Sequence, residues 1–152
     1  MTKDDEDAAS DPSPMRRRPG YLLRRAHQIH DALWAARVSQ DTTPTQFAVL
    51  SVVAHLGRAD QTAVAREASL DTSTAGAVVY RLIERGWLRA ETSPLDRRRN
   101  LLSLTPDGEA NYLRIARAAT ELTDDLVGPL PAPDREALIA LLQRLVAAHE
   151  RA

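Results

Sequence analysis

Apolar residues recur every three or four positions along most of the chain beyond residue 20, which is the spacing of one helix face. The pattern predicts one helix over residues 21–39, a second beginning at Pro44, a third beginning at Pro106 and a last one over about residues 134–151. Each of these prolines follows a threonine that can cap the helix, and Thr43-Pro-Thr-Gln46 also has the spacing of a capping box. The residues predicted to face inward are Leu22, Ala26, Ile29, Leu33, Phe47, Leu50, Val53, Ala54, Tyr112, Ile115, Ala119, Leu122, Leu126, Leu138, Leu141, Leu142, Leu145 and Val146.

A shorter helix is predicted between Asp71 and Gly86, and both of its ends are marked. The Asp71 carboxylate can accept hydrogen bonds from the amides of the first turn, and Gly86 stands where a left-handed residue ends a helix. Ala75, Val78 and Leu82 share one side and are predicted to face a core. The opposite side carries small hydroxyls, a phenol and a guanidinium, which can contact bases in the major groove of DNA. Its residues are Ser73, Thr74, Ala77, Tyr80 and Arg81.

The segments on either side of this helix complete a motif. Asp60 can cap a short helix over residues 61–68, and two short helices joined by a tight turn form a helix-turn-helix. Residues 86–92 and 101–105 are predicted strands with a turn between them, so they form a hairpin. A hairpin beside a recognition helix is a wing. The sequence therefore predicts a mainly α fold with a winged helix-turn-helix DNA-binding domain over residues 44–105.

Three consecutive arginines, Arg97, Arg98 and Arg99, occupy the tip of the predicted wing. Their guanidinium groups can neutralise phosphates or enter a minor groove. A solvated turn is the alternative interpretation of such a triplet, but its position directly after a helix-turn-helix favours contact with DNA. A free carboxylate near DNA would be repelled, so Asp96 is interpreted as an ion-pair brace of the wing.

Alternatives stay open for some residues of the recognition helix. Ser73 and Thr74 are favoured in any first helical turn, although we favour DNA contact for both. Tyr80 is equally compatible with DNA contact and with packing under the wing. Trp87, at the start of the first predicted strand, is assigned to the core.

Composition narrows the function classes. The 20 basic and 21 acidic residues give a net charge of −1, so overall charge does not argue for nucleic acid. The chain has no cysteine, which excludes disulfides, thiolate catalysis and cysteine-ligated zinc. No phosphate-binding glycine loop, nucleophile elbow or paired-carboxylate signature is present, so we expect neither catalysis nor a cofactor. No apolar run reaches the length of a membrane span, and we expect a cytoplasmic protein that does not contact membranes.

The two ends of the chain differ in character. Residues 1–19 are acidic, then rich in proline and arginine, and we expect them to be disordered. Arg16–Arg18 can touch a phosphate backbone, but a solvated tail is the favoured interpretation. Residues 20–40 and 106–152 carry more apolar surface than the central domain can cover. We therefore expect these helices to pack together and against a second copy, which gives a homodimer with two recognition helices for a palindromic duplex.

The first predicted helix also carries candidate ligand-binding groups. His27, His30 and Trp34 lie near one face, and burial in a dimer core is the favoured interpretation. As an alternative, these rings can bind an aromatic carboxylate, with Arg24 or Arg25 as the countercharge. The histidine pair with Asp31 adjacent also suggests a metal site. Because no further ligand cluster occurs elsewhere, we expect no metal.

The chain resembles the MarR family of winged-helix transcription regulators over roughly residues 20–150. The resemblance is carried by Leu50–Ala54, by Ser73–Leu88 and by Ser93–Gly108. Its most specific parts are Leu82-x-x-Arg-Gly86, Asp96-x-Arg98 and Leu104-Thr-Pro-x-Gly108.

The resemblance implies a homodimer with a triangular helical body that binds a pseudo-palindromic operator in double-stranded DNA and usually represses. It implies that Asp96 braces the wing, that Arg98 enters the minor groove, and that Ser73, Thr74 and Arg81 touch bases or phosphates. Residues 19–30 resemble the branch that controls degradation of aromatic acids or their CoA thioesters, which implies a small aromatic effector. The alternative function is a winged-helix module that binds only other proteins.

Overall fold

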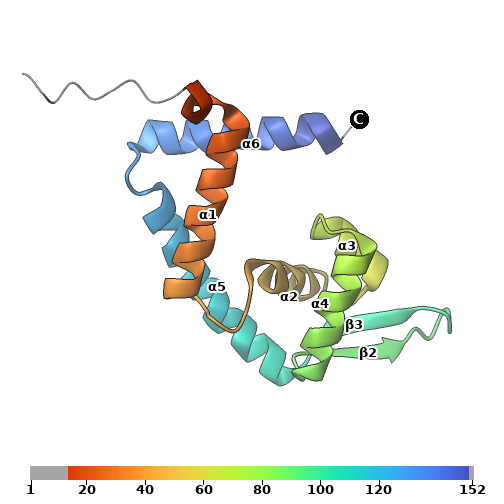
Figure 1. The fold of residues 1–152 in the computed structure, drawn as a ribbon. Coiled ribbons are helices and arrows are strands. Elements are labelled where there is room, and N and C mark those ends of the chain that lie inside the picture. The colour runs from red at the N-terminus through yellow and green to blue at the C-terminus, as the bar shows by residue number, and fades with distance from the viewer. Residues whose placement is uncertain (1–13, 151–152) are drawn as a thin grey trace, which may run out of the picture.

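The computed structural model describes residues 14–150, and each helix and hairpin strand predicted for this part of the chain is present. The elements in order are η1 (Pro14–Arg17), α1 (Pro19–Arg37), α2 (Pro44–Leu56), β1 (Ala59–Asp60), α3 (Gln61–Glu67), α4 (Thr72–Glu84), β2 (Leu88–Thr92), β3 (Asn100–Leu104), α5 (Pro106–Val127) and α6 (Ala132–Glu150). In Figure 1, α2, α3, α4 and the β2–β3 hairpin form one lobe, and α5 leads away from it to α6. The fold is mainly helical with a small sheet, as predicted.

Local capping fixes where the helices begin. The Thr43 hydroxyl accepts from Gln46 N–H at 3.1 Å, and the Gln46 side chain accepts from Thr43 N–H at 3.1 Å, so the predicted capping box is confirmed. The side chains of Asp60, Asp71 and Thr105 accept hydrogen bonds from the third residue of their own helices. Each cap satisfies an amide that has no partner inside the helix.

The core lies where α2, α4, α5 and the sheet meet. Leu50 and Val53 of α2 and Leu82 of α4 are fully buried, and Ile115 of α5 packs in the same cluster. Trp87, assigned to the core from the sequence, is also buried there. Burial of the inner side of α4 leaves its polar side pointing outward, as the spacing predicted.

The sheet contains one strand that the sequence did not reveal. It is antiparallel with the order β1–β3–β2, and β1 pairs Ala59 with Leu102 and Asp60 with Leu101. A strand of two residues has no periodic pattern, so only its long-range partner defines it. The β2–β3 hairpin was predicted, and its register runs from Leu88 opposite Leu104 outward to the wing.

Two glycines hold the junctions around the hairpin. Gly86 has φ +72°, so the predicted left-handed end of α4 is confirmed. Gly108, in the first turn of α5, packs so closely on the strand that a Cβ atom there would lie 1.9 Å from the Trp87 carbonyl oxygen. Only a residue without a side chain fits that contact.

The start of the chain differs from the prediction. Residues 1–13 of the tail predicted to be disordered lie outside the described residues, but Pro14–Arg17 forms a 3₁₀ turn and α1 begins at Pro19. Proline fixes φ near the helical value and needs no partner for its nitrogen, so Pro19 starts the helix two residues earlier than predicted.

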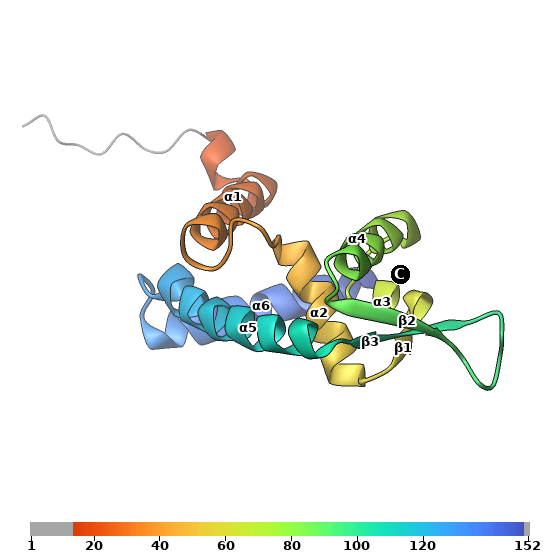
Figure 2. The same ribbon diagram turned by 90° about the horizontal axis from the view of Figure 1, so that it is seen from below.

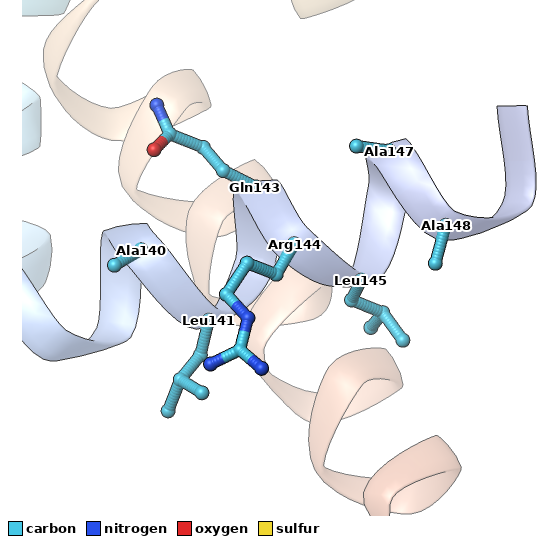
Figure 3. A pocket seen from close by; sticks show the side chains of 7 residues that line it. All are labelled: Ala140, Leu141, Gln143, Arg144, Leu145, Ala147 and Ala148. Atoms are coloured by element: carbon cyan, nitrogen blue, oxygen red, sulfur yellow. The ribbon is translucent and has the colours of Figure 1, made fainter. Parts of the chain in front are cut away.

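Helix α6 leaves its predicted inward residues uncovered. None of its residues is buried, and Leu138, Leu141, Leu142, Leu145 and Val146 are all exposed. Figure 3 shows part of this surface, a groove of about 800 Å³ lined by residues of α6 alone. Leu22 and Ile29 of α1 are exposed as well. Within residues 14–150, no helix is long and apolar enough to cross a membrane.

Candidate nucleic-acid interface

The outward side of α4 carries the five residues predicted from the sequence to contact DNA. All five are exposed, and Tyr80 keeps 62% of its surface accessible. They come together because Ala75, Val78, Val79 and Leu82 bury the other side of the same helix. The exposed residues are Ser73, Thr74, Ala77, Tyr80 and Arg81.

Two of these side chains already have partners on their own helix. The Thr74 hydroxyl donates to Asp71 Oδ2 at 2.5 Å, and Thr74 N–H donates to Asp71 Oδ1 at 2.8 Å. These bonds, led by the hydroxyl, lower the pKa of Asp71. Tyr80 OH donates to Glu84 Oε1 at 2.8 Å, and this bond together with the charge of Glu84 raises the pKa of Tyr80. Tyr80 therefore lies in the open on α4 rather than under the wing.

The wing projects from the lobe beyond β2 and β3 (Figure 2). Its turn is closed by backbone bonds: Ser93 N–H donates to the Arg99 carbonyl at 2.8 Å, and Arg99 N–H donates to the Asp96 carbonyl at 3.0 Å. The Asp96 carboxylate accepts from Arg98 N–H at 2.9 Å. Asp96 thus acts on the wing backbone, and among the described residues it forms no ion pair of the kind predicted.

The three wing arginines have different surroundings. The Arg99 guanidinium pairs with the Asp60 carboxylate, which also caps α3. Arg97 and Arg98 are exposed, and neither forms an ion pair within residues 14–150. A second ion pair, Arg58 with Glu91 at 2.5 Å, connects the loop before β1 to β2. Neither ion pair was predicted from the sequence, because the partners lie far apart along the chain.

A cavity of about 360 Å³ lies where the end of α1 meets the start of α2. Two of the predicted effector residues, His27 and Trp34, line it. His30 lies next to it, with its ring centroid 6.0 Å from that of Trp34. The full lining is His27, Asp31, Trp34, Ala35, Ser39, Gln40, Thr42, Thr43, Pro44 and Thr45.

The predicted countercharges do not line this cavity. The Arg24 guanidinium lies 5.5 Å from the centre of the Tyr21 ring, and the Arg25 guanidinium donates to Gln28 at 2.9 Å. Both contacts stay within α1. Of the predicted effector residues with a nitrogen-bearing side chain, His27 and Trp34 line the cavity.

The possible metal ligands on α1 do lie together. His27, His30 and Asp31 offer ligand atoms within 4.8 Å of one another. His30 Nδ1 forms a hydrogen bond with Asp31 Oδ1 at 3.4 Å, and His27 Nε2 lies 3.4 Å from Asp31 Oδ2, so the carboxylate already contacts both rings. The expectation that no metal binds here stays a prediction.

Comparison with known proteins identifies the fold and the family of this chain. Residues 40–99 match the MarR family. A proposed transcriptional regulatory protein for the hcr operon of Thauera aromatica is 34% identical over 128 residues, which cover 83% of this chain and 77% of that protein. The chain belongs to the MarR family. It is thus a transcriptional regulator of the MarR type, and the resemblance stated from the sequence is confirmed.

Other MarR-family proteins match over most of their length. The transcriptional repressor NicR of Pseudomonas putida is 28% identical, covering 88% of this chain and 85% of that protein. The crystal structure of the PcaV transcriptional regulator of Streptomyces coelicolor with its natural ligand has a TM-score of 0.84 at 35% identity, covering 93% of this chain and 99% of that one. Bordetella bronchiseptica BpsR, whose DNA binding is regulated by 6-hydroxynicotinic acid, has a TM-score of 0.84 at 31% identity, covering 90% and 98%. These relatives are regulators and not enzymes.

Proposed function

We propose that this MarR-family regulator is a repressor that binds a pseudo-palindromic operator as a homodimer and leaves it when a small aromatic acid binds. The observation that carries the proposal is the exposed polar side of α4 beside a wing with two unpaired arginines in the described chain. A recognition helix and a basic wing on one lobe can occupy adjacent major and minor grooves. The relatives NicR, a repressor, and BpsR, whose DNA binding responds to an aromatic acid, support it.

Within this proposal, the α4 residues Ser73, Thr74, Ala77, Tyr80 and Arg81 face the major groove. The Thr74 hydroxyl gives its proton to Asp71, so toward DNA it can accept a hydrogen bond from a base donor group but cannot donate one to a phosphate. Arg97 and Arg98 reach the minor groove or its phosphates. Arg99 was also predicted to contact DNA. Its guanidinium is paired with Asp60 at the base of the wing, so any contact of Arg99 with phosphates is made from there.

The uncovered apolar side chains of α1 and α6 support a dimer. Apolar surface of this extent is stabilised when a second copy covers it, and two-fold dimers are the most common oligomers. A two-fold axis would present two copies of α4 to the two halves of a palindrome. In this arrangement residues 20–40 and 106–152 form the dimerisation region, and residues 44–105 form the DNA-binding domain.

The effector is proposed to occupy the 360 Å³ cavity between α1 and α2, a volume within the range of about 300–1,000 Å³ found for small-molecule sites. The Trp34 ring offers an aromatic surface, and the His27 imidazole offers a hydrogen-bonding group for a carboxylate. His30 supports the Trp34 ring from outside the cavity. Arg24 and Arg25, the original candidates, would need to leave Tyr21 and Gln28 to take part.

The proposal is tested by titrating the protein into a labelled duplex and following fluorescence anisotropy. We use the DNA upstream of the protein's own gene and a random duplex of the same length, each over a range of salt concentrations. Binding should weaken steeply with salt, by a log–log slope of about 0.9 per phosphate neutralised, and should favour the upstream DNA. Release by 6-hydroxynicotinic acid would support the effector assignment. No binding to either duplex would favour the alternative, a module that binds only proteins.

A further inference from the structure

Thr42 connects the cavity wall to the rest of the protein through three hydrogen bonds. Its side chain lines the cavity region, yet the residue is only 1% exposed. The Thr42 carbonyl accepts from Trp34 Nε1 at 2.6 Å, and Thr42 N–H donates to Ser39 Oγ at 2.9 Å. The Thr42 hydroxyl accepts from Arg85 Nη1 at 3.3 Å. One residue therefore contacts the proposed effector site on one side and an arginine of the DNA-binding lobe on the other.

Arg85 is the residue that caps the C-terminal end of α4. Besides Thr42, the same nitrogen donates to the Asp41 carbonyl at 2.9 Å. The guanidinium carbon lies 3.8 Å from the centre of the Trp87 ring, a cation–π contact with a buried residue of the core. Charge-assisted hydrogen bonds and ring stacking together leave the guanidinium little freedom. Arg85 thus fastens the loop before α2 to the end of the recognition helix.

The hydrogen bonds of Arg85 to Asp41 and Thr42 connect the cavity directly to α4. Elsewhere α4 packs on α2, α3 and β2, while α1, which carries His27 and Trp34, packs on α5. An occupant of the cavity must touch Trp34 or the segment of residues 39–45, which is the loop before α2 and its first two residues, since these form most of the cavity wall. A shift of the Thr42 backbone changes the position of its hydroxyl, and the acceptor of Arg85 moves with it.

We propose that Thr42 and Arg85 couple occupancy of the cavity to the position of α4. Arg85 is a positioning residue: it acts on the DNA-contacting side of α4 by holding the helix end and does not itself belong to that side. A ligand in the cavity displaces the Asp41 carbonyl and the Thr42 hydroxyl, which accept hydrogen bonds from Arg85. The end of α4 then either moves with Arg85 or loses these two hydrogen bonds. The coupling rests on the proposed function, because it presupposes an effector in this cavity and DNA on α4.

The first experiment measures coupling in the full-length protein, with 6-hydroxynicotinic acid as the probe. The observable is the ratio of the DNA dissociation constants with and without the acid. For the wild type we expect a ratio of at least about five, the lower end of typical allosteric coupling. Arg85→Met keeps an unbranched stem but removes every donor, so the ratio of its DNA dissociation constants should fall toward one while its own affinity for the acid changes less than twofold. Arg114→Met is the matched control, since within residues 14–150 the Arg114 guanidinium hydrogen-bonds only Asn111 of its own helix.

A ratio in Arg85→Met equal to that of the wild type would overturn the coupling. A structural role alone would lower DNA affinity equally with and without the acid and would leave the ratio unchanged. If the acid does not change the DNA affinity of the wild type, the assignment of the effector fails. A second experiment then tests the connection between Thr42 and Arg85 without the acid.

That experiment needs neither DNA nor effector. Amide hydrogen exchange is measured at residues 83–87 in the wild type, in Thr42→Val, in Arg85→Met and in the double variant. Thr42→Val removes the acceptor at the cavity wall, and we expect exchange at the end of α4 to rise at least about twofold, the smallest coupling typical of residues in contact. In the Arg85→Met background, Thr42→Val should add nothing. Unchanged exchange in Thr42→Val, or additive effects in the double variant, would overturn the proposal.

Discussion

Identical side chains have different roles according to what surrounds them. The arginine triplet looks uniform in the sequence, but Arg99 is held by Asp60 whereas Arg97 and Arg98 extend from the wing. Asp60 also caps α3, so one carboxylate joins the wing to the first helix of the helix-turn-helix. We therefore assign DNA contact chiefly to Arg97 and Arg98, and wing placement to Arg99.

We expect Arg98→Ala to weaken binding to duplex DNA by about tenfold or more, which corresponds to at least about 1.4 kcal/mol. The log–log salt slope should also become shallower by about 0.9, because one phosphate contact is lost. Fluorescence anisotropy across a salt series measures both quantities. Arg114→Ala is the control, and an affinity loss in it as large as that in Arg98→Ala would show that the effect is one of total charge.

Gly108→Ala should destabilise the fold by about 1–3 kcal/mol, the usual cost of forcing an extra carbon into a packed site. The new Cβ would lie 1.9 Å from the Trp87 carbonyl oxygen, so the start of α5 must move away from the strand. Gly20→Ala in α1 is the matched control, since among the described residues no atom beyond its chain neighbours and its own helix backbone lies within 4 Å of the added carbon. The control should be unchanged or up to about 1 kcal/mol more stable. Urea denaturation compares the two, and equal midpoints would contradict the close contact.

At the scale of elements, the features that could be predicted from the sequence are those set by residues within one helical turn of each other, such as helix caps and the two sides of a helix. Thr43 and Gln46 cap α2 reciprocally, and their spacing is visible in the sequence. The outward side of α4 was predictable for the same reason, since helical periodicity alone separates its polar and apolar residues. The hydrogen bonds of Thr74 and Tyr80 are also local, and Asp71 and Glu84 stand at the spacing that allows them.

Contacts between segments that are distant in the sequence could not be predicted. Strand β1 exists only because Leu101 and Leu102 pair with it. The Arg99–Asp60 pair joins residues 39 apart, and the Arg85–Thr42 bond joins residues 43 apart. The cavity, too, forms where α1 and α2 meet, so its lining differs from the face of α1 that suggested Arg24 and Arg25.

The cap of α4 makes its stability depend on pH. Because the pKa of Asp71 is lowered in the folded protein, the folded state favours the charged carboxylate. Its contribution is fully present above the unfolded pKa of about 3.9 and is lost as pH falls through the lower folded value. Asp71→Asn keeps a capping acceptor but cannot ionise. The difference in unfolding free energy between wild type and Asp71→Asn should be constant near neutral pH and should shrink below about pH 4. A difference that grows on acidification would contradict the sign of this shift.

At the scale of the whole molecule, the apolar surface of α6 is the main feature that one chain leaves unexplained. Leu142 and Leu145 are exposed on a helix with no buried residue. A charge placed in an apolar interface is costly to bury, so Leu142→Glu with Leu145→Glu should convert the proposed dimer into monomers. Sedimentation velocity measures the change, and DNA affinity should fall with it because the two half-sites are no longer bound together.

Leu95→Glu is the control for this prediction. Leu95 is 97% exposed at the wing and lies outside every helix and strand, so the same chemical change should leave the sedimentation coefficient unaltered. A dimer that survives both charges in α6 would place the interface elsewhere on the chain.

The two tryptophans of the chain have a further use. Trp34 forms part of the cavity wall, and Trp87 lies under the guanidinium that ends the recognition helix. Intrinsic fluorescence therefore samples both ends of the suggested connection with no dye attached. In a Trp87→Phe variant the emission comes from Trp34 and would report the filling of the cavity. Subtracting this emission from that of the wild type would leave the change in fluorescence of Trp87.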